Sequence, residues 1–165
     1  MATGKPILTF RKAERKDCAL IVRFIRLLAD YEKLLHEVEA TPEVIEEWVF
    51  DRHGAEVVFA EVDGGAVGFA LYFYNFSTFV GRSGLYLEDL FVLPEQRGKG
   101  YGKALMLHLV EKAYTCGCGR MEWICLDWNK SSLAFYRSLG AVPVDGWTVQ
   151  RLNREGLKRL AEPSL

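Results

Sequence analysis

The sequence lacks the long apolar run that a membrane-spanning helix needs, and it lacks an excess of charge of either sign. Its 165 residues include 21 Lys and Arg against 22 Asp and Glu, for a formal net charge of −1. A chain without basic excess has little electrostatic attraction for nucleic acid or an anionic membrane surface. The first residues show no signal-peptide pattern. We therefore expect a cytoplasmic protein with neither nucleic-acid nor membrane partners.

Cysteine and histidine are scarce and irregularly spaced. The sequence has 4 Cys and 3 His, and three of the cysteines (Cys116, Cys118 and Cys125) lie close together. A structural zinc site uses Cys pairs separated by two to four residues, with a second pair or histidines nearby, and this spacing is missing. We expect no metal site, and free thiols in a reducing compartment.

Half of the residues are hydrophobic and 26% are charged, as in a folded globular protein. The length suits a single domain over residues 1–165. Apolar periodicity and turn residues predict strands over 7–11, 57–62, 66–76, 85–92 and 120–127, helices over 18–31, 42–50, 101–114, 131–139 and 155–161, and a hairpin over 142–152. Asp17 and Thr41 are expected N-caps. This order predicts an α/β (α+β) fold with a mixed, mostly antiparallel central sheet flanked by helices.

A basic, glycine-rich run, Arg-Gly-Lys-Gly-Tyr-Gly at residues 97–102, precedes a helix-forming segment. Backbone amides at a helix start can hold a phosphate, although such a run alone can also be an ordinary tight turn. The Ser or Thr of a Walker loop is absent after Lys99 and Lys103. The run also lies mid-chain, after a hairpin, which argues against a dinucleotide fingerprint.

The run fits the Arg/Gln-x-x-Gly-x-Gly/Ala motif of the GNAT superfamily of N-acetyltransferases. Other motifs extend the resemblance over nearly the whole chain, and they resemble the diamine and thialysine acetyltransferases of that superfamily. These motifs are Ala-Asp-Tyr-Glu at 29–32, Leu-Tyr-Leu-Glu-Asp at 85–89, Asp-Trp-Asn at 127–129, Ser132-x-x-Phe135-Tyr136-x-x-x-Gly140-Ala141, and Gly146-Trp147. The resemblance implies the single-domain GNAT fold and acetyl-CoA as cosubstrate, without a metal.

The resemblance also implies which residues hold acetyl-CoA. The backbone of a splayed strand would pair with the pantetheine arm, the glycine-rich run would hold the pyrophosphate, and two residues after a second splayed strand would contact the cofactor further along. The matching residues are, in that order, Leu90, Phe91 and Val92; Arg97, Gly98, Lys99, Gly100, Tyr101, Gly102 and Lys103; and Asn129 and Ser132. Taken alone, each cation of the run would ordinarily be a solvated surface residue.

Two residues match catalytic positions. Tyr136 matches the tyrosine that protonates the leaving thiolate, a task suited to a phenol with a pKa of about 10; without the motif, core packing beside Phe135 would be the preferred interpretation. Glu88 matches the glutamate proposed to accept the proton of the substrate ammonium, and on a half-buried strand its pKa should be raised. A structural ion pair is the alternative for Glu88. Asp89 is expected to face the other side of the strand and not to act with Glu88.

The implied substrate is a small primary amine, such as a diamine, a polyamine or a lysine-like amino acid of the thialysine kind, acetylated by direct transfer in a ternary complex. Substrate-side positions of the family are matched by Tyr31, Glu32, Glu88, Glu122, Trp123 and Asp145. The loop over residues 77–82 has Arg82 but not the aspartate of polyamine acetyltransferases, which favours a compact amine over spermine.

The resemblance also implies a homodimer. The alternatives are a non-catalytic acyl-CoA-binding or regulatory module, against which Tyr136 and Glu88 argue, and a protein-lysine acetyltransferase.

Overall fold

The computed structural model describes residues 6–162 of the chain. The chain forms two compact units, Met1–Ile124 and Cys125–Leu165. Residues 1–5, where the sequence predicts no signal peptide, and residues 163–165 lie outside the described part. That residues 1–165 behave as one domain stays a prediction. Among the described residues, no helix is long and apolar enough to cross a membrane.

The helices and strands follow the predicted order through most of the chain. The first unit contains β1 (Leu8–Lys12), α1 (Cys18–Tyr31), α2 (Pro42–Ile45), a π-helical turn (Glu46–Asp51), β2 (Glu56–Val62), β3 (Gly65–Ser77), β4 (Arg82–Val92), α3 (Tyr101–Thr115) and β5 (Arg120–Glu122). Short 3₁₀ turns lie at Arg15–Asp17, Leu35–Glu37 and Pro94–Gln96. The second unit contains α4 (Lys130–Ser138) and α5 (Arg154–Ala161).

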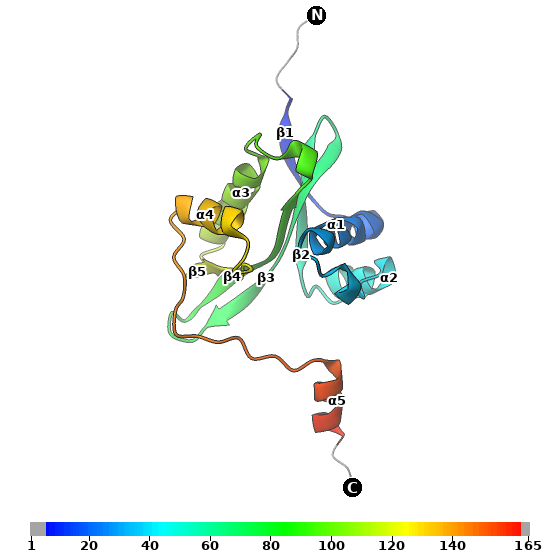
Figure 1. The fold of residues 1–165 in the computed structure, drawn as a ribbon, viewed down its shortest axis with the longest axis vertical. Helices are drawn as coiled ribbons and strands as arrows, with labels where there is room; N and C mark the ends of the chain where they lie inside the picture. The colour runs from blue at the N-terminus through cyan, green and yellow to red at the C-terminus, as the bar shows by residue number, and fades with distance from the viewer. Residues whose placement is uncertain (1–5, 163–165) are drawn as a thin grey trace, which may run out of the picture. The chain divides into compact units, whose positions relative to one another are not determined.

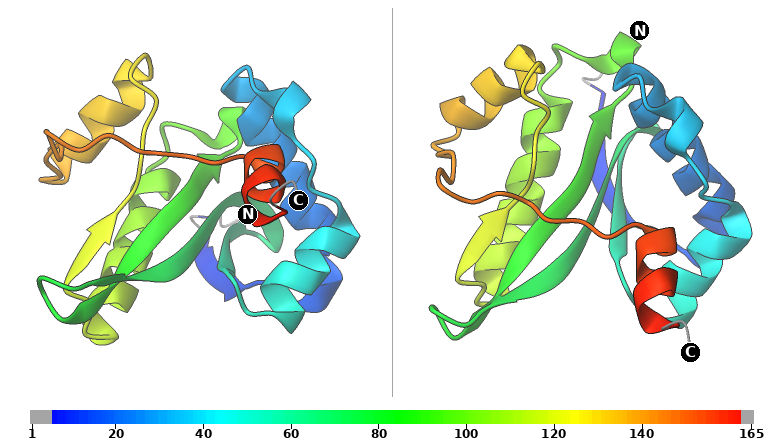
Figure 2. Two further views of the ribbon diagram at one scale, coloured as in Figure 1. Left: turned by 90° about the horizontal axis from the view of Figure 1, so that it is seen from below. Right: turned by 60° about the horizontal axis from the view of Figure 1, so that its bottom comes forward.

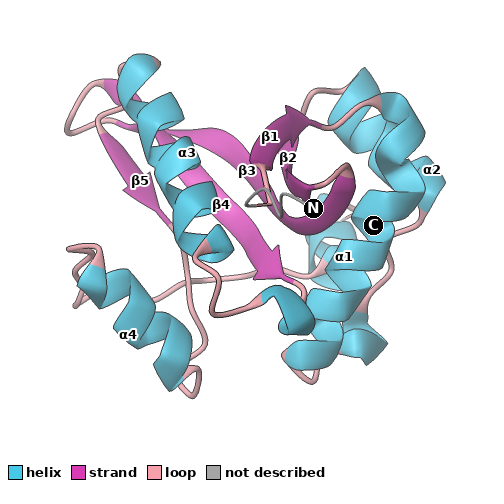
Figure 3. Cartoon of the chain, turned by 90° about the horizontal axis from the view of Figure 1, so that it is seen from above, coloured by secondary structure: helices cyan, strands magenta, loops and turns pink. Residues whose placement is uncertain are grey.

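The five strands form one sheet in the order β1-β2-β3-β4-β5. Neighbouring strands are antiparallel, except for the parallel pair β4 and β5. Helices α1 and α2 cover one face of the sheet and α3 covers the other (Figures 1 and 3). Figure 2 shows the same layers from below, with α1 and α2 in blue and cyan and α3 in light green. The expected mixed, mostly antiparallel sheet with flanking helices is confirmed.

Aromatic side chains fill the core between α1 and the sheet. The ring of Phe24 in α1 lies 5.2 Å from the ring of Phe69, 5.9 Å from that of Phe59 and 6.5 Å from that of Phe91, measured between centroids. All four side chains are at most 4% exposed. Burying a large apolar side chain of this kind contributes about 1.5–3 kcal/mol. The cluster therefore fixes α1 against the strands from which the candidate site is built.

A β-bulge interrupts β4 at Glu88. In the ladder with β3, Leu87 pairs with Tyr72 and Asp89 pairs with Leu71, so Glu88 between them has no partner residue on β3. An extra residue bends its strand and breaks the alternation of side chains between the two faces of the sheet. Leu87 therefore shares the face of Tyr72, whose ring lies under the Lys112 ammonium of α3. The next residue after the bulge lies on the opposite face.

Parallel pairing between β4 and β5 is short. It joins Gly84, Leu85 and Tyr86 to Arg120, Met121 and Glu122, and β5 ends there. The strand expected over residues 120–127 is therefore wrong beyond Glu122. The physical reason is the bulge, which bends β4 just after the last paired residue and removes a straight edge for β5 to follow.

The hairpin expected over residues 142–152 is also wrong, because these residues form neither strand nor helix. Their apolar side chains are largely exposed: Val142 by 79%, Val144 by 65%, Trp147 by 76% and Val149 by 70%. A two-stranded ribbon is marginally stable unless a third strand or a helix covers its apolar face. The alternating pattern alone was insufficient to form strands.

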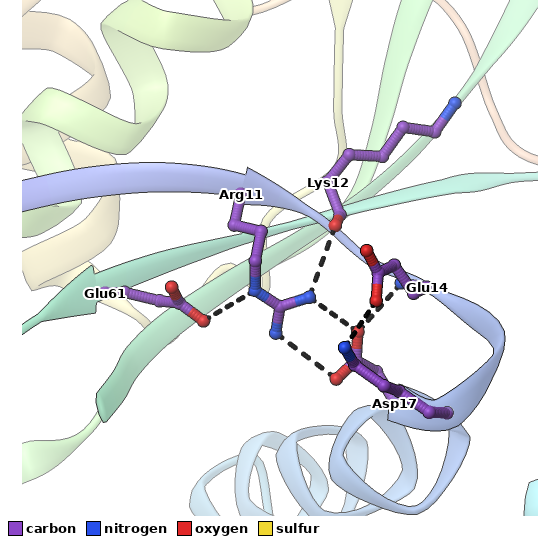
Figure 4. A network of polar contacts seen from close by, with 6 residues as sticks. Arg11, Lys12, Glu14, Asp17 and Glu61 are labelled. Atoms are coloured by element: carbon purple, nitrogen blue, oxygen red, sulfur yellow. Dashed lines mark hydrogen bonds and ion pairs between the residues drawn. The ribbon is translucent and has the colours of Figure 1, made fainter. Parts of the chain in front are cut away.

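Asp17 precedes α1 as expected, but its carboxylate does not cap that helix. It accepts hydrogen bonds from the Arg11 guanidinium at 2.7 Å and from the Glu14 backbone N–H at 2.8 Å, and Arg11 also donates to Glu61 at 2.8 Å (Figure 4). The hydrogen bond from Arg11 lowers the pKa of Asp17 below its ordinary value. Asp17 thus ties the start of α1 to β1 and β2. By contrast Thr41 caps α2 as predicted, accepting from the Val44 N–H at 3.3 Å.

We expect Asp17→Asn to lower the free energy of unfolding at neutral pH by about 1–3 kcal/mol, because a charged hydrogen bond to Arg11 is lost at a buried position. The pKa of Asp17 is lowered in the folded protein, so its contribution is present above the unfolded pKa and is lost as pH falls through the folded pKa. Urea unfolding at pH 7 and below pH 4 measures both effects. The matched control is Asp63→Asn, in an exposed turn at φ 51° that asparagine also adopts. Equal losses in both variants would contradict this role of Asp17.

Candidate active site

The glycine-rich run forms the loop before α3 and leaves its backbone amides accessible. Gly98 and Gly100 have φ values of 75° and 85°, a region that favours glycine, and Gly100 is the N-cap of α3. A Cβ added at either glycine would meet nothing within 4 Å, so the space above the loop is open. The first amides of a helix have no intrahelical acceptor. Amides of Tyr101, Gly102 and Lys103 at the positive end of a helix dipole therefore fit a pyrophosphate.

The edge of β4 that faces away from β3 is open near its end. The Leu93 N–H donates to the Val67 carbonyl on β3 at 2.9 Å. In a trans peptide the carbonyl points opposite to the N–H, so the Val92 carbonyl points away from β3. By alternation, the backbone groups of Leu90 face the same way, while the Phe91 side chain is buried in the core. In the described chain no strand pairs with this edge beyond Tyr86, which leaves room for an extended pantetheine arm.

Two cations of the loop have defined side-chain contacts. The Arg97 Nε donates to the Val92 carbonyl at 3.0 Å, and its guanidinium lies over the rings of Tyr31 and Phe91. The Lys99 ammonium donates to the Gln96 side chain at 2.8 Å. Both residues are exposed enough to add positive charge beside the loop. Their direct contact with phosphate stays a prediction.

The negative charges of two carboxylates, Glu88 and Glu32, act on a third carboxyl group, Asp89, near the bulge. Asp89 is half-buried on the face of the sheet that α1 covers, and desolvation raises its pKa to about 7, with further contributions from the negative charges of Glu88 and Glu32. Burial also raises the pKa of Glu32, the residue that ends α1. A carboxyl group with a pKa near 7 can accept and release a proton at neutral pH.

This arrangement corrects two expectations about Glu88. It is exposed rather than half-buried, because the bulge turns it out of the ladder. Asp89 was expected to face the other side of the strand and not to act with Glu88; the bulge breaks the alternation on which that expectation depended, and the charge of Glu88 contributes to the raised pKa of Asp89. The acid with the strongly raised pKa is Asp89, which the sequence argument set aside. The sequence feature that could have identified Asp89 is the presence of an aspartate within an otherwise apolar strand.

The remaining predicted residues of the first unit differ in their surroundings. Tyr31 is the last residue of α1 and is half-buried. The Glu122 carboxylate accepts from Arg120 at 2.8 Å and from the Asn75 amide at 3.2 Å, so it has structural partners at the end of the sheet. Trp123 follows β5 and is half-buried. Glu32 thus acts on Asp89 and Tyr31 lies against the Arg97 guanidinium, while Glu122 is held by an ion pair.

Four predicted residues lie in the second unit. Asn129 is 7% exposed and caps α4, its side-chain oxygen accepting from the Ser132 N–H at 3.2 Å. Tyr136 is half-buried on α4, with its ring 5.2 Å from that of Phe135. Asp145 is exposed in a turn. The local structure gives Asn129 and Ser132 a capping role, and their contact with a cofactor stays a prediction.

Within residues 6–162, no three His, Cys, Asp or Glu side chains gather closely enough to hold a metal ion. All four cysteines, Cys18, Cys116, Cys118 and Cys125, are free thiols. The chemistry available near β4 is thus an open strand edge, a helix start suited to phosphate, and a group of carboxyl side chains.

Sequence comparison places this site in a known context. Residues 21–141 match the acetyltransferase (GNAT) family. The thialysine N-epsilon-acetyltransferase of Mus musculus is 36% identical over 163 residues, which cover 92% of this chain and 95% of the relative.

Solved structures agree with the fold. An integron cassette protein from the mobile metagenome of V. cholerae superposes with a TM-score of 0.79 at 28% identity, over 94% of this chain and 98% of that one. An aminoglycoside N-acetyltransferase in complex with CoA superposes with a TM-score of 0.73 at 18% identity, over 92% and 99% of the two chains, a likeness that concerns the fold alone. From the match over residues 21–141 and the full-length relative, this chain belongs to the GNAT family and is an N-acetyltransferase.

Proposed function

We propose that the enzyme transfers the acetyl group of acetyl-CoA directly to the primary amine of a small molecule in a ternary complex. The substrate class is a diamine, a polyamine or a lysine-like amino acid such as thialysine, with compact amines preferred. The observation that carries the proposal is the acidic group of Glu32, Glu88 and Asp89 at the bulge of β4. This group attracts a cationic amine, and Tyr31 beside Glu32 adds an aromatic surface for it.

On the donor side, the residues fit acetyl-CoA, the cosubstrate that GNAT enzymes use. The open edge at Leu90 and Val92 would pair with the pantetheine arm, and the amides from Gly98 to Lys103 would hold the pyrophosphate. Asn129 and Ser132 would contact the cosubstrate further along. The thioester supplies the acetyl group, and the chain's own residues bind it, orient it and move protons.

Asp89 joins Glu88 as a proton acceptor for the amine. An alkylammonium with a pKa of about 10.4 is almost fully protonated at neutral pH and must lose a proton before it attacks. Asp89, with a pKa near 7, is a stronger base than an ordinary carboxylate and so accepts that proton more readily. Glu88, which is exposed beside it, provides a route for the proton to solvent.

Tyr136 is the proposed general acid. Attack by the neutral amine on the acetyl carbonyl carbon forms a tetrahedral intermediate, which collapses when the carbon–sulfur bond breaks. The phenol donates its proton to the leaving thiolate, and the nitrogen gives up its second proton to restore the phenol, so that the products are a neutral amide and the free CoA thiol. This sequence needs no covalent acyl-enzyme and therefore no nucleophilic cysteine.

One prediction concerns the substrate. We expect acetyl-CoA turnover with thialysine, lysine and short diamines, weaker turnover with spermine because the loop at residues 77–82 lacks an acid, and little with a lysine-containing peptide. Release of free CoA thiol over this amine panel, with product mass to show N-acetylation, is the measurement. Turnover of the peptide alone, or of no amine while CoA still binds, would overturn the proposal.

The same assay on Tyr136→Phe separates chemistry from binding. Loss of a general acid should lower kcat about 100-fold or more, whereas the CoA dissociation constant should stay within about twofold of the wild-type value. An unchanged kcat would remove Tyr136 from the mechanism.

Another prediction concerns the pH profile. Because Asp89 acts as a base, kcat/KM for the amine should rise with pH through about 7. In Asp89→Asn this limb should disappear and the rate should fall, while the limb due to the amine's own deprotonation remains at higher pH. In Glu88→Gln the limb should move to lower pH, because loss of a neighbouring negative charge lowers the pKa of Asp89. A limb that disappears only in Glu88→Gln would make Glu88 the base instead.

We also propose a homodimer, from the exposed apolar side chains of residues 142–149. Large exposed apolar surfaces in a folded protein commonly mark interaction sites. Light scattering should give twice the 18.8 kDa chain mass, and Trp147→Ser should weaken association with little change in thermal stability. A mass near 18.8 kDa at every concentration tested would contradict the dimer.

A further inference from the structure

The Arg97 side chain makes contacts that a residue devoted to phosphate binding would not need. Its Nε donates to the Val92 carbonyl at 3.0 Å. Its guanidinium carbon lies 4.7 Å from the centroid of the Tyr31 ring and 5.1 Å from that of the Phe91 ring. One planar group therefore contacts the end of β4, the aromatic core and the last residue of α1.

The Val92 carbonyl that Arg97 engages points into the open edge of β4, opposite to the Leu93 N–H that bonds to β3. Arg97 itself lies one residue before Gly98, where the open loop begins. The side chain therefore spans from the loop assigned to the pyrophosphate to the strand edge assigned to the pantetheine arm. Both ends of this span belong to the donor side of the proposed site.

The contact with the Tyr31 ring connects Arg97 to the amine side of the proposed site. Tyr31 ends α1, and the next residue, Glu32, acts electrostatically on Asp89. The same helix is anchored through Phe24, whose ring meets the Phe91 ring edge-on at 6.5 Å. Arg97 therefore contacts the residue that directly precedes Glu32, which belongs to the amine side of the proposed site.

The neighbouring cation behaves differently. The Lys99 ammonium is exposed and donates to Gln96 at 2.8 Å. Stacking on two rings while donating in the plane to a carbonyl requires a planar guanidinium, which an ammonium cannot replace. Arg97 and Lys99 therefore offer a matched pair of cations from one loop.

We propose that Arg97 is a positioning residue that couples the donor loop to the amine-binding wall at the end of α1. The inference rests on the proposed function for the amine-side role of Tyr31. A pyrophosphate bound to the adjoining loop restrains Arg97, which in turn restrains the Tyr31 ring that it already contacts. Acetyl-CoA binding would thus preorganise the amine site and lower the cost of binding the second substrate.

The kinetic test is a double-mutant cycle of Arg97→Lys and Tyr31→Leu. Arg97→Lys keeps the charge and loses the stacking plane, so the amine KM should rise about three- to tenfold, the range of a cation–π contact. The CoA dissociation constant and the unfolding temperature should be nearly unchanged. Tyr31→Leu should raise the amine KM at least as much, because it also removes the aromatic surface for the amine. The double variant should be little worse than Tyr31→Leu alone, because both lack the Arg97–Tyr31 contact.

A second readout does not depend on turnover. In the wild type, CoA binding should slow hydrogen exchange at the amides of Glu32, Lys33 and Leu34, which donate to carbonyls at the end of α1. In Arg97→Lys, CoA should still bind, but this protection should be lost. Lys99→Gln is the matched control, in which CoA binding weakens while protection at saturating CoA is retained.

The outcomes separate the inference from the proposed function. If the wild type acetylates no amine, the proposed function fails, and the exchange experiment still decides whether Arg97 couples the loop to α1. If amines are acetylated but the two substitutions act independently, or if protection persists in Arg97→Lys, the coupling role is overturned. A CoA affinity that falls in Arg97→Gln and is fully restored in Arg97→Lys, with an unchanged amine KM, would make Arg97 a simple phosphate contact.

Discussion

The β-bulge at Glu88 is the constraint on which the rest of the site depends. It inserts one residue into β4 opposite β3, so that Leu87 and Asp89 face opposite sides of the sheet. The side chain that turns toward α1 is an aspartate, where burial and the charges of Glu88 and Glu32 raise its pKa to about 7. The same bend ends the pairing of β4 with β5 at Tyr86. The bulge therefore accounts both for an aspartate with a raised pKa and for a strand edge without a neighbouring strand.

The open edge and the start of α3 belong to one continuous segment. β4 ends at Val92, a single 3₁₀ turn follows at Pro94–Gln96, and the loop with Gly98 and Gly100 then leads into α3. This short connection brings an unpaired strand edge and unpaired helix amides close together in sequence. The Val92 carbonyl at this edge already accepts from Arg97, and an extended amide-containing arm and a pyrophosphate could bind the other outward-facing backbone groups and the helix amides.

The aromatic core links this segment to the opposite wall. Phe24, Phe69 and Phe91 hold α1 against β3 and β4, and the end of α1 then carries Tyr31 and Glu32 toward the acids at the bulge. Arg97 joins the two parts, because its guanidinium stacks on the Tyr31 ring while its Nε donates to the Val92 carbonyl. The glycine-rich loop and the end of α1 are thus connected through packing, hydrogen bonding and cation–π contact.

The sequence by itself determined the mixed sheet, the order of helices and strands through α4, the glycine turns at Gly98 and Gly100, and the family, because periodicity, turn chemistry and motifs are local properties. Only the tertiary structure decided that β5 stops at Glu122, that residues 142–152 form no hairpin, that the pKa of Asp89 is strongly raised, and that Arg97 stacks on Tyr31. Each of these depends on pairing register or on contacts between residues distant in sequence. A one-residue bulge reverses the face of every side chain that follows it, and no local pattern reveals where that bulge occurs.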